Sequence, residues 1–100
     1  MASGSPDWSP RIVSSGSASQ NAKANVTAAE TVVTFTNIVL SFIIYNDGPN
    51  AIYVSRATGV DTDDFKVPSG SWMMMDVPSK SIYLICAAAQ TATCYMIGVY

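Results

Sequence analysis

Cysteine, lysine and carboxylate side chains are the groups best suited to chemistry in this 100-residue chain. Histidine, the usual catalytic base, does not occur in it. Nucleophilic catalysis by serine or cysteine needs a neighbouring base, and here only a lysine or a carboxylate could serve. Nothing in the sequence places Lys66 or Lys80 beside a particular serine. We therefore expect a protein that is not an enzyme, with no catalytic residue and no cofactor.

The only cluster of charge is Asp61-Thr62-Asp63-Asp64. Carboxylates at alternate positions can bind Ca²⁺, but an EF-hand loop also needs a glycine and a distal glutamate, and neither stands at the right offset. We expect a solvated turn without a metal, in which the aspartates accept hydrogen bonds from nearby backbone N–H groups.

Cys86 and Cys94 are the two cysteines, and their spacing is not that of a CxxC motif. They lie symmetrically about Gln90, in a segment that could be a hairpin, and would then face each other across its strands. A cross-strand disulfide is geometrically possible. In a reducing cytoplasm, buried free thiols are favoured.

Short β-rich runs alternate with turn clusters from Ile38 to Tyr100, which predicts a barrel or sandwich. Before them, 26–36 favours a strand with Val33 and Phe35 on one face, and Asn37 marks a bend or bulge. The run 38–45 is apolar on both faces and predicts a central strand covered on both sides. Further strands are expected at 51–55, 65–67, 72–77, 81–86 and 92–100, with 87–91 closing a hairpin.

The last two predicted strands alternate regularly, so each should present two different faces. One face carries Ile82, Leu84, Cys86, Cys94 and Met96, and the other carries Tyr83, Ile85, Tyr95, Ile97 and Val99.

Residues 1–25 differ from the rest, because Ser, Ala, Asn, Gly and Pro dominate there. Only Trp8, Ile12 and Val13 could anchor apolar contacts, so the segment cannot fold alone. It is either a floppy terminus or an arm that orders on a neighbouring subunit. The predicted organisation is an extended or flexible arm at 1–25 and one β-sandwich domain at 26–100.

Charge is scarce: 12% of residues are charged and 49% are hydrophobic, against a usual charged share of about 25%. Such a surface is suited to being covered by a neighbour. The five basic residues are scattered, which argues against nucleic acid. No apolar run reaches the ~18 residues of a membrane span. The N-terminus lacks the pattern of a signal peptide, so we expect folding in a cytoplasm.

Trp72-Met73-Met74-Met75 is the least usual run. In a strand, Trp72 and Met74 share one face, and Met73 and Met75 share the other. Methionine fills irregular gaps in a core and also suits adaptable contact surfaces, so one face could meet a partner subunit. Trp72, Tyr45 and Tyr53 could alternatively form an aromatic surface that stacks on a sugar.

Four stretches resemble the C-terminal part of small virion proteins of tailed bacteriophages, over a little over half the chain. They are Ile44–Val54 (IYNDGPNAIYV), Asp63–Ser71 (DDFKVPSGS), Asp76–Cys86 (DVPSKSIYLIC) and Ala92–Tyr100 (ATCYMIGVY). The methionine run replaces what is more often a polar strand in such proteins. The resemblance implies a β-sandwich that assembles into virions, as a capsid decoration (cement) protein, a head–tail or tail component, or a fibre-associated module.

We therefore predict an all-β, jelly-roll-like sandwich with an extended N-terminal arm. Its expected function is that of a phage capsid decoration protein that forms dimers or trimers, bridges subunits of the major capsid protein, and is assembled in the host cytoplasm. A head–tail connector or tail component is one alternative, and a carbohydrate-binding module is another. The predicted contact residues are Trp8, Ile12, Val13, Trp72, Met73 and Met75.

Overall fold

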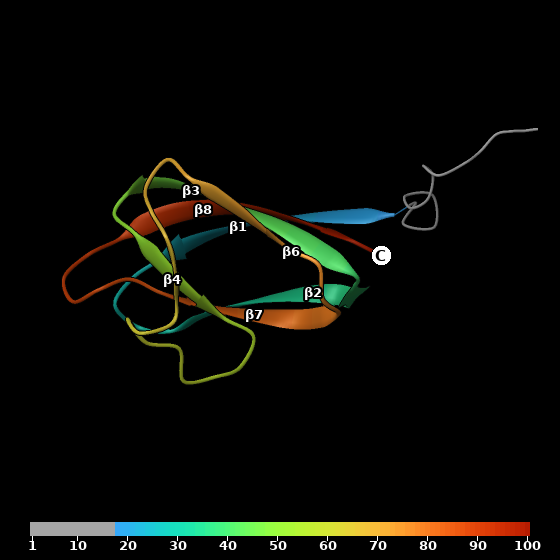
Figure 1. The fold of residues 1–100 in the computed structure, drawn as a ribbon, viewed down its shortest axis with the longest axis horizontal. Coiled ribbons are helices and arrows are strands. Elements are labelled where there is room, and N and C mark those ends of the chain that lie inside the picture. Colours follow the sequence, from blue (N-terminus) through green and yellow to red (C-terminus); the bar gives the residue numbers. More distant parts are fainter. Residues whose placement is uncertain (1–17) are drawn as a thin grey trace, which may run out of the picture.

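The computed structural model describes residues 18–100, which form strands and no helix. The strands are β1 (Ser19–Val26), β2 (Thr31–Val39), β3 (Ser41–Pro49), β4 (Ile52–Ser55), β5 (Phe65–Val67), β6 (Trp72–Met75), β7 (Ser79–Ile85) and β8 (Ala92–Val99). They make two four-stranded antiparallel sheets, in the orders β1-β8-β3-β6 and β2-β7-β4-β5. Figure 1 shows the two sheets as separate layers. The prediction of an all-β fold is confirmed.

The chain pairs from its ends inward: β1 with β8, β2 with β7, β3 with β6 and β4 with β5. These pairs alternate between the two sheets, so only the β4–β5 connection stays within one sheet. The predicted hairpin at 87–91 is therefore wrong. Both edges of β7 are already paired, with β2 and with β4, and 87–91 instead carries the chain across to the other sheet.

The predicted strand at 38–45 is also divided between the sheets. β2 ends at Val39, β3 begins at Ser41, and the N–H of Leu40 between them donates to the carbonyl of Val99 at 2.6 Å. β3 does lie inside its sheet, between β8 and β6, but its outward side chains are exposed rather than covered. The irregularity predicted near Asn37 is confirmed, because the register between β2 and β7 shifts after Thr34.

One core fills the space between the sheets, and both sheets contribute to it. Phe35 from β2 and Phe42 from β3 are its largest fully buried side chains. The other core side chains come from the inward positions of the strands, because buried and exposed positions alternate along a strand. The division of the last two strands into two faces is confirmed, and the inward face is the one that carries five buried side chains: Ile82, Leu84, Cys86, Cys94 and Met96.

β1 falls almost wholly within the segment that composition assigned to an arm. It pairs with β8 along its whole length, from Ser19 opposite Val99 to Val26 opposite Ala92. An edge strand needs few large apolar residues, because backbone pairing and the small inward side chains of Ala24 and Val26 suffice to hold it. The residues predicted as arm anchors, Trp8, Ile12 and Val13, lie outside the described residues.

Candidate functional site

Two rows of side chains cross the outer face of the β1-β8-β3-β6 sheet. Cross-strand register aligns the first row from β6 to β1 as Trp72, Tyr45, Tyr95 and Lys23. It aligns the second row, in the same direction, as Met74, Ile43, Ile97 and Asn21. We call these residues the platform. Directly opposed side chains in a sheet lie close enough to contact one another, so each row is a continuous surface.

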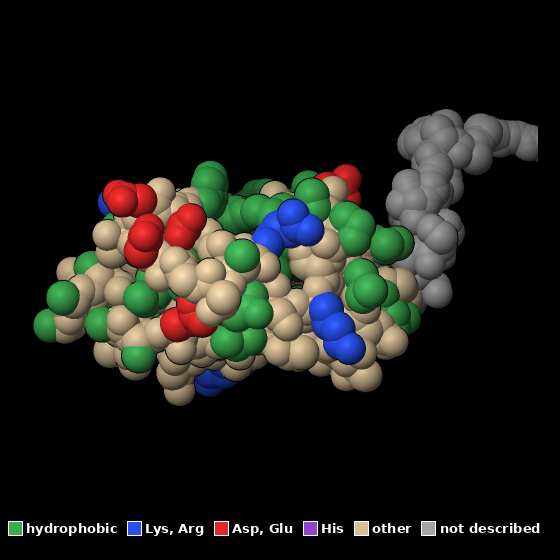
Figure 2. All heavy atoms as spheres, turned by 90° about the horizontal axis from the view of Figure 1, so that it is seen from below, with side chains coloured by type: hydrophobic (Ala, Val, Ile, Leu, Met, Phe, Trp, Pro, Cys, Tyr) green, Lys and Arg blue, Asp and Glu red, His purple; other side chains and the backbone are tan. Residues whose placement is uncertain are grey.

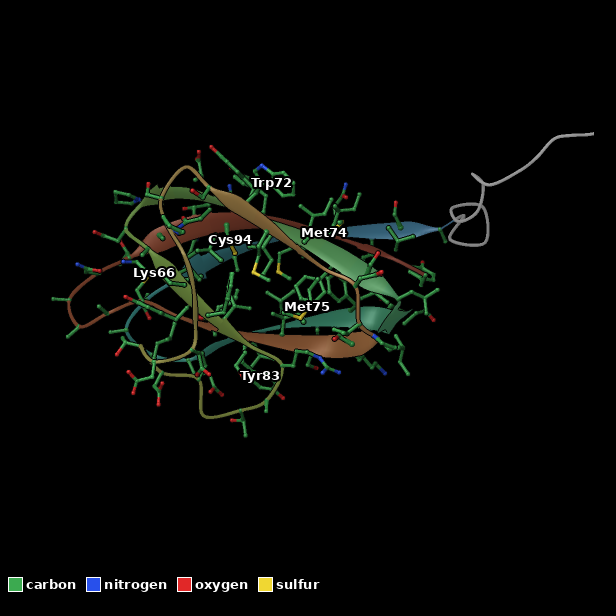
Figure 3. The ribbon with its side chains drawn as sticks, viewed as in Figure 1. Lys66, Trp72, Met74, Met75, Tyr83 and Cys94 are labelled. Carbon is green, nitrogen blue, oxygen red and sulfur yellow. The ribbon has the colours of Figure 1, made fainter. Side chains whose placement is uncertain are left out.

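The platform points outward because side chains alternate along each strand. Met73 and Met75 on β6 pack against the core, which turns their neighbours Trp72 and Met74 to solvent. Trp72 is 63% exposed and Met74 is 62% exposed. Figure 3 shows Trp72 on the outer side of β6, whereas Met75 lies between the two sheets.

A shallow hollow lies on the β1 side of the platform. Its volume is about 400 Å³, and residues of β1, β3 and β8 line it, among them Asn21, Ile43, Tyr45, Tyr95 and Ile97. The lining is mainly apolar, and Asn21 and the two tyrosines are its polar residues. The two most exposed platform residues, Trp72 and Met74, stand on β6 and outside this lining.

Charge is almost absent from the platform. Lys23 is its only charged residue, and its Nζ lies 5.5 Å from the centroid of the Tyr95 ring, within the range of a cation–π interaction. No carboxylate occurs in either row. A large apolar surface with little charge has the composition of the centre of a protein–protein interface, where Trp, Tyr and Met are enriched.

The predicted contact residues separate into three groups. Trp72 is exposed on the platform, whereas Met73 and Met75 are half-buried and pack against the core. Met74, which was not among them, shares the outward face with Trp72. The predicted residues Trp8, Ile12 and Val13 lie outside the part of the chain that the structure describes.

The aromatic residues predicted to stack on a sugar do not share one surface. Trp72 and Tyr45 are cross-strand neighbours, but Tyr53 lies on β4 in the other sheet. Tyr95 takes the third place in the row. Alternation along 92–100 places Tyr95 outward, yet only the pairing of β8 with β3 brings it beside Tyr45, and that pairing cannot be read from the sequence.

The hydrogen bonds predicted between aspartates and the backbone of the acidic loop are present. Asp64 accepts a hydrogen bond from the N–H of Asp61 through Oδ2 at 2.8 Å, and Asp61 accepts one from the N–H of Asp63 through Oδ1 at 2.9 Å. Within residues 18–100, no group of three cysteine or carboxylate side chains is placed to hold a metal ion. Figure 2, viewed from the side of β2 and β7, shows acidic side chains gathered toward one end of a largely uncharged surface.

Cys86 and Cys94 are both buried and are not joined by a disulfide. Cys86 directly follows β7 of one sheet, and Cys94 lies within β8 of the other sheet. The two cysteines therefore do not face each other across a hairpin. Burial raises the pKa of the Cys94 thiol to about 11 and also raises the pKa of Cys86. Both thiols are therefore mainly protonated near neutral pH, which lowers their reactivity.

None of residues 18–100 belongs to a helix capable of spanning a membrane. The chain matches no protein-family model, and no curated protein matches its sequence.

Proposed function

We propose that this chain is a non-enzymatic structural protein of a bacteriophage virion, a capsid decoration protein that assembles with other protein subunits through its platform. The observation that carries this proposal is the pair of apolar cross-strand rows, in which Trp72 and Met74 are more than half exposed. Exposed apolar surfaces such as these two rows, on a domain with so few charges, mark sites of association.

The path of the chain supports the proposal. The strands pair from the ends inward and alternate between the sheets β1-β8-β3-β6 and β2-β7-β4-β5, a pairing order that supports a jelly-roll winding. We infer a jelly-roll β-sandwich, an architecture found in viral capsid domains and in lectins. Because a fold alone does not assign a function, its weight comes from agreement with the sequence resemblance over Ile44–Tyr100.

The titratable groups with shifted pKa values support a structural rather than a catalytic protein. The carboxylate of Glu30 accepts hydrogen bonds from three groups of one loop, which lowers its pKa. The thiols of Cys86 and Cys94 are buried in the core. Each of these groups serves the fold, and none pairs a nucleophile with a base at the platform.

Assembly would bury the platform against protein and stabilise both partners by mass action. The arm residues Trp8, Ile12 and Val13 would add contacts from the segment that precedes β1. Together, the platform and the arm would let one subunit bridge neighbouring capsid subunits.

The test is binding of the purified protein to parent capsid shells that lack it, measured by co-sedimentation. We expect saturable binding by the wild type, and loss of binding when residues 1–17 are removed. Val32→Glu is a control that should bind the shells as the wild type does, because Val32 is an exposed apolar residue of the other sheet and lies outside the platform. A wild-type protein that ignores the shells would overturn the proposal.

Carbohydrate binding is a second candidate, which the row of three aromatic residues Trp72, Tyr45 and Tyr95 favours. The row borders the hollow, whose volume of about 400 Å³ is typical of small-ligand sites. Binding on a glycan array that Trp72→Ala abolishes, and that Tyr53→Ala on the other sheet preserves, would support it. An array without binding would remove this candidate.

A further inference from the structure

We infer that a second copy of this chain occupies the platform, in a two-fold contact that places β6 of each copy over β1 of the other, at the rim of the hollow. This inference rests on the proposed function and deepens it by naming the partner of the surface. It depends on three features of the platform: its shape, its charge and its area.

The shape of the platform is self-complementary. Trp72 and Met74 form a ridge on β6, at one edge of the sheet. The hollow lies toward the opposite edge, among residues of β1, β8 and β3. A two-fold axis parallel to the strands inverts the order of the strands across the sheet, so the ridge of each copy lies over the hollow side of its partner. One symmetric contact then covers both hollows, with β3 and β8 of each copy over β8 and β3 of the other.

The charge of the platform fits the same arrangement. Lys23 stands on β1, at the far end of the row that Trp72 begins. The two-fold contact therefore keeps the two lysines at opposite edges and sets each one against Trp72 of the partner subunit. An ammonium group over an indole ring is a favourable cation–π pair. Lys23 is the only cation on the platform, so the platform offers little attraction to an acidic protein or a nucleic acid.

The exposed area is sufficient for a specific contact. Trp72, Met74, Tyr95, Tyr45 and Ile43 together expose roughly 500 Å² of apolar surface in each copy, from their exposed fractions and the sizes of such side chains. A symmetric contact that covers all of it doubles that to about 1,000 Å², near the lower limit for a biological interface. The flanking residues Lys23, Asn21 and Ile97 would add to it.

The mass of the full chain in solution tests the inference, measured by light scattering after size exclusion across a range of protein concentrations. We expect twice the chain mass of 10.6 kDa. Met74→Glu on the ridge and Asn21→Glu at the hollow should each halve the mass, because each buries a carboxylate in the contact. Val32→Glu on the other sheet should leave it unchanged. A melting temperature for each variant shows that it is folded.

The outcomes separate this inference from the proposed function. A wild-type monomer, or an oligomer that survives both platform variants, overturns the inference. If that monomer still binds shells, the proposed function stands and the platform meets the capsid instead. A dimer that both variants break but that ignores shells supports the inference and overturns the decoration function.

Discussion

The side-chain amide of Asn46 on β3 donates a hydrogen bond of 2.9 Å to the carbonyl of Val67 on β5, across the two sheets. The same Nδ2 donates to the carbonyl of Asn50 at 2.8 Å, and Oδ1 accepts from the N–H of Gly48. Asn46 is fully buried, and this one side chain satisfies three backbone groups where the chain crosses between sheets. It fixes the corner at which the chain passes from β3 to β4 in the other sheet.

Asn46→Ala should therefore lower the free energy of unfolding by about 3 kcal/mol, because it leaves buried backbone groups without partners. Denaturant unfolding monitored by tryptophan fluorescence measures the loss. Asn50→Ala is the matched control: its amide makes one exposed hydrogen bond, to the carbonyl of Thr91, so its removal should cost less than about 1 kcal/mol. Equal losses from the two variants would contradict the role given to Asn46.

Glu30 ties the corner between β1 and β2 to the loop between β4 and β5. Its carboxylate accepts hydrogen bonds from the N–H of Gly59 at 2.7 Å, the hydroxyl of Thr58 at 2.9 Å and the N–H of Val60 at 3.2 Å. These bonds favour the ionised form and lower the pKa of Glu30 below its usual value of 4.5, the bond from Gly59 most of all.

The lowered pKa predicts a pH dependence of stability with a definite sign. A group whose pKa is lower in the folded state contributes stability above its unfolded pKa and loses that contribution as pH falls through the folded pKa. The melting temperature of the wild type should exceed that of Glu30→Gln near neutral pH, and the difference should close below pH 4.5. A constant difference across this range would show that the charge of Glu30 plays no part.

Local features of the fold could be predicted from the sequence, but the distribution of strands between the sheets could not. Alternation predicted which residues share a face in β2, β7 and β8, and turn residues marked where strands end. A turn such as 46–50 or 87–91 has the same chemistry whether it closes a hairpin or crosses between sheets. Pairing decides between the two, and here Ser19 pairs with Val99, at the other end of the chain.

The candidate site was predictable only in part for the same reason. The sequence shows the unusual run at 72–75, and alternation predicts that Trp72 and Met74 face away from Met73 and Met75. Which pair faces solvent depends on how β6 pairs with β3 over the core. The platform as a surface depends on register between strands far apart in sequence, which aligns Trp72, Tyr45 and Tyr95 in one row.

Burial of the two cysteines predicts slow thiol chemistry. Desolvation raises the pKa of the Cys94 thiol to about 11, so very little thiolate exists near neutral pH, and the core shields both thiols from reagents. In the folded protein, an aromatic disulfide reagent should react with neither cysteine over minutes. In denaturant it should react with two thiols per chain. Fast reaction of the native protein would show that the core opens.

Gly98 on β8 lies against the side chains of Val39 and Phe35 from the other sheet. A Cβ at this position would lie 2.6 Å from Cγ1 of Val39, closer than such atoms pack. It would also lie 3.1 Å from the ring of Phe35, tighter than most such contacts. Gly98→Ala should therefore cost about 2 kcal/mol of stability through overpacking. At Gly59, by contrast, an added Cβ meets nothing within 4 Å, so Gly59→Ala is destabilising only through its φ of +90°.

A double-mutant cycle with Val39→Ala separates overpacking from other causes. Val39→Ala alone leaves a cavity and should cost about 2 kcal/mol. In the Gly98→Ala background, the removed methyl groups make room for the new Cβ, so the double variant should be more stable than the two single losses predict. If the two losses of stability were strictly additive, the side chain of Val39 would not be what excludes a Cβ at position 98.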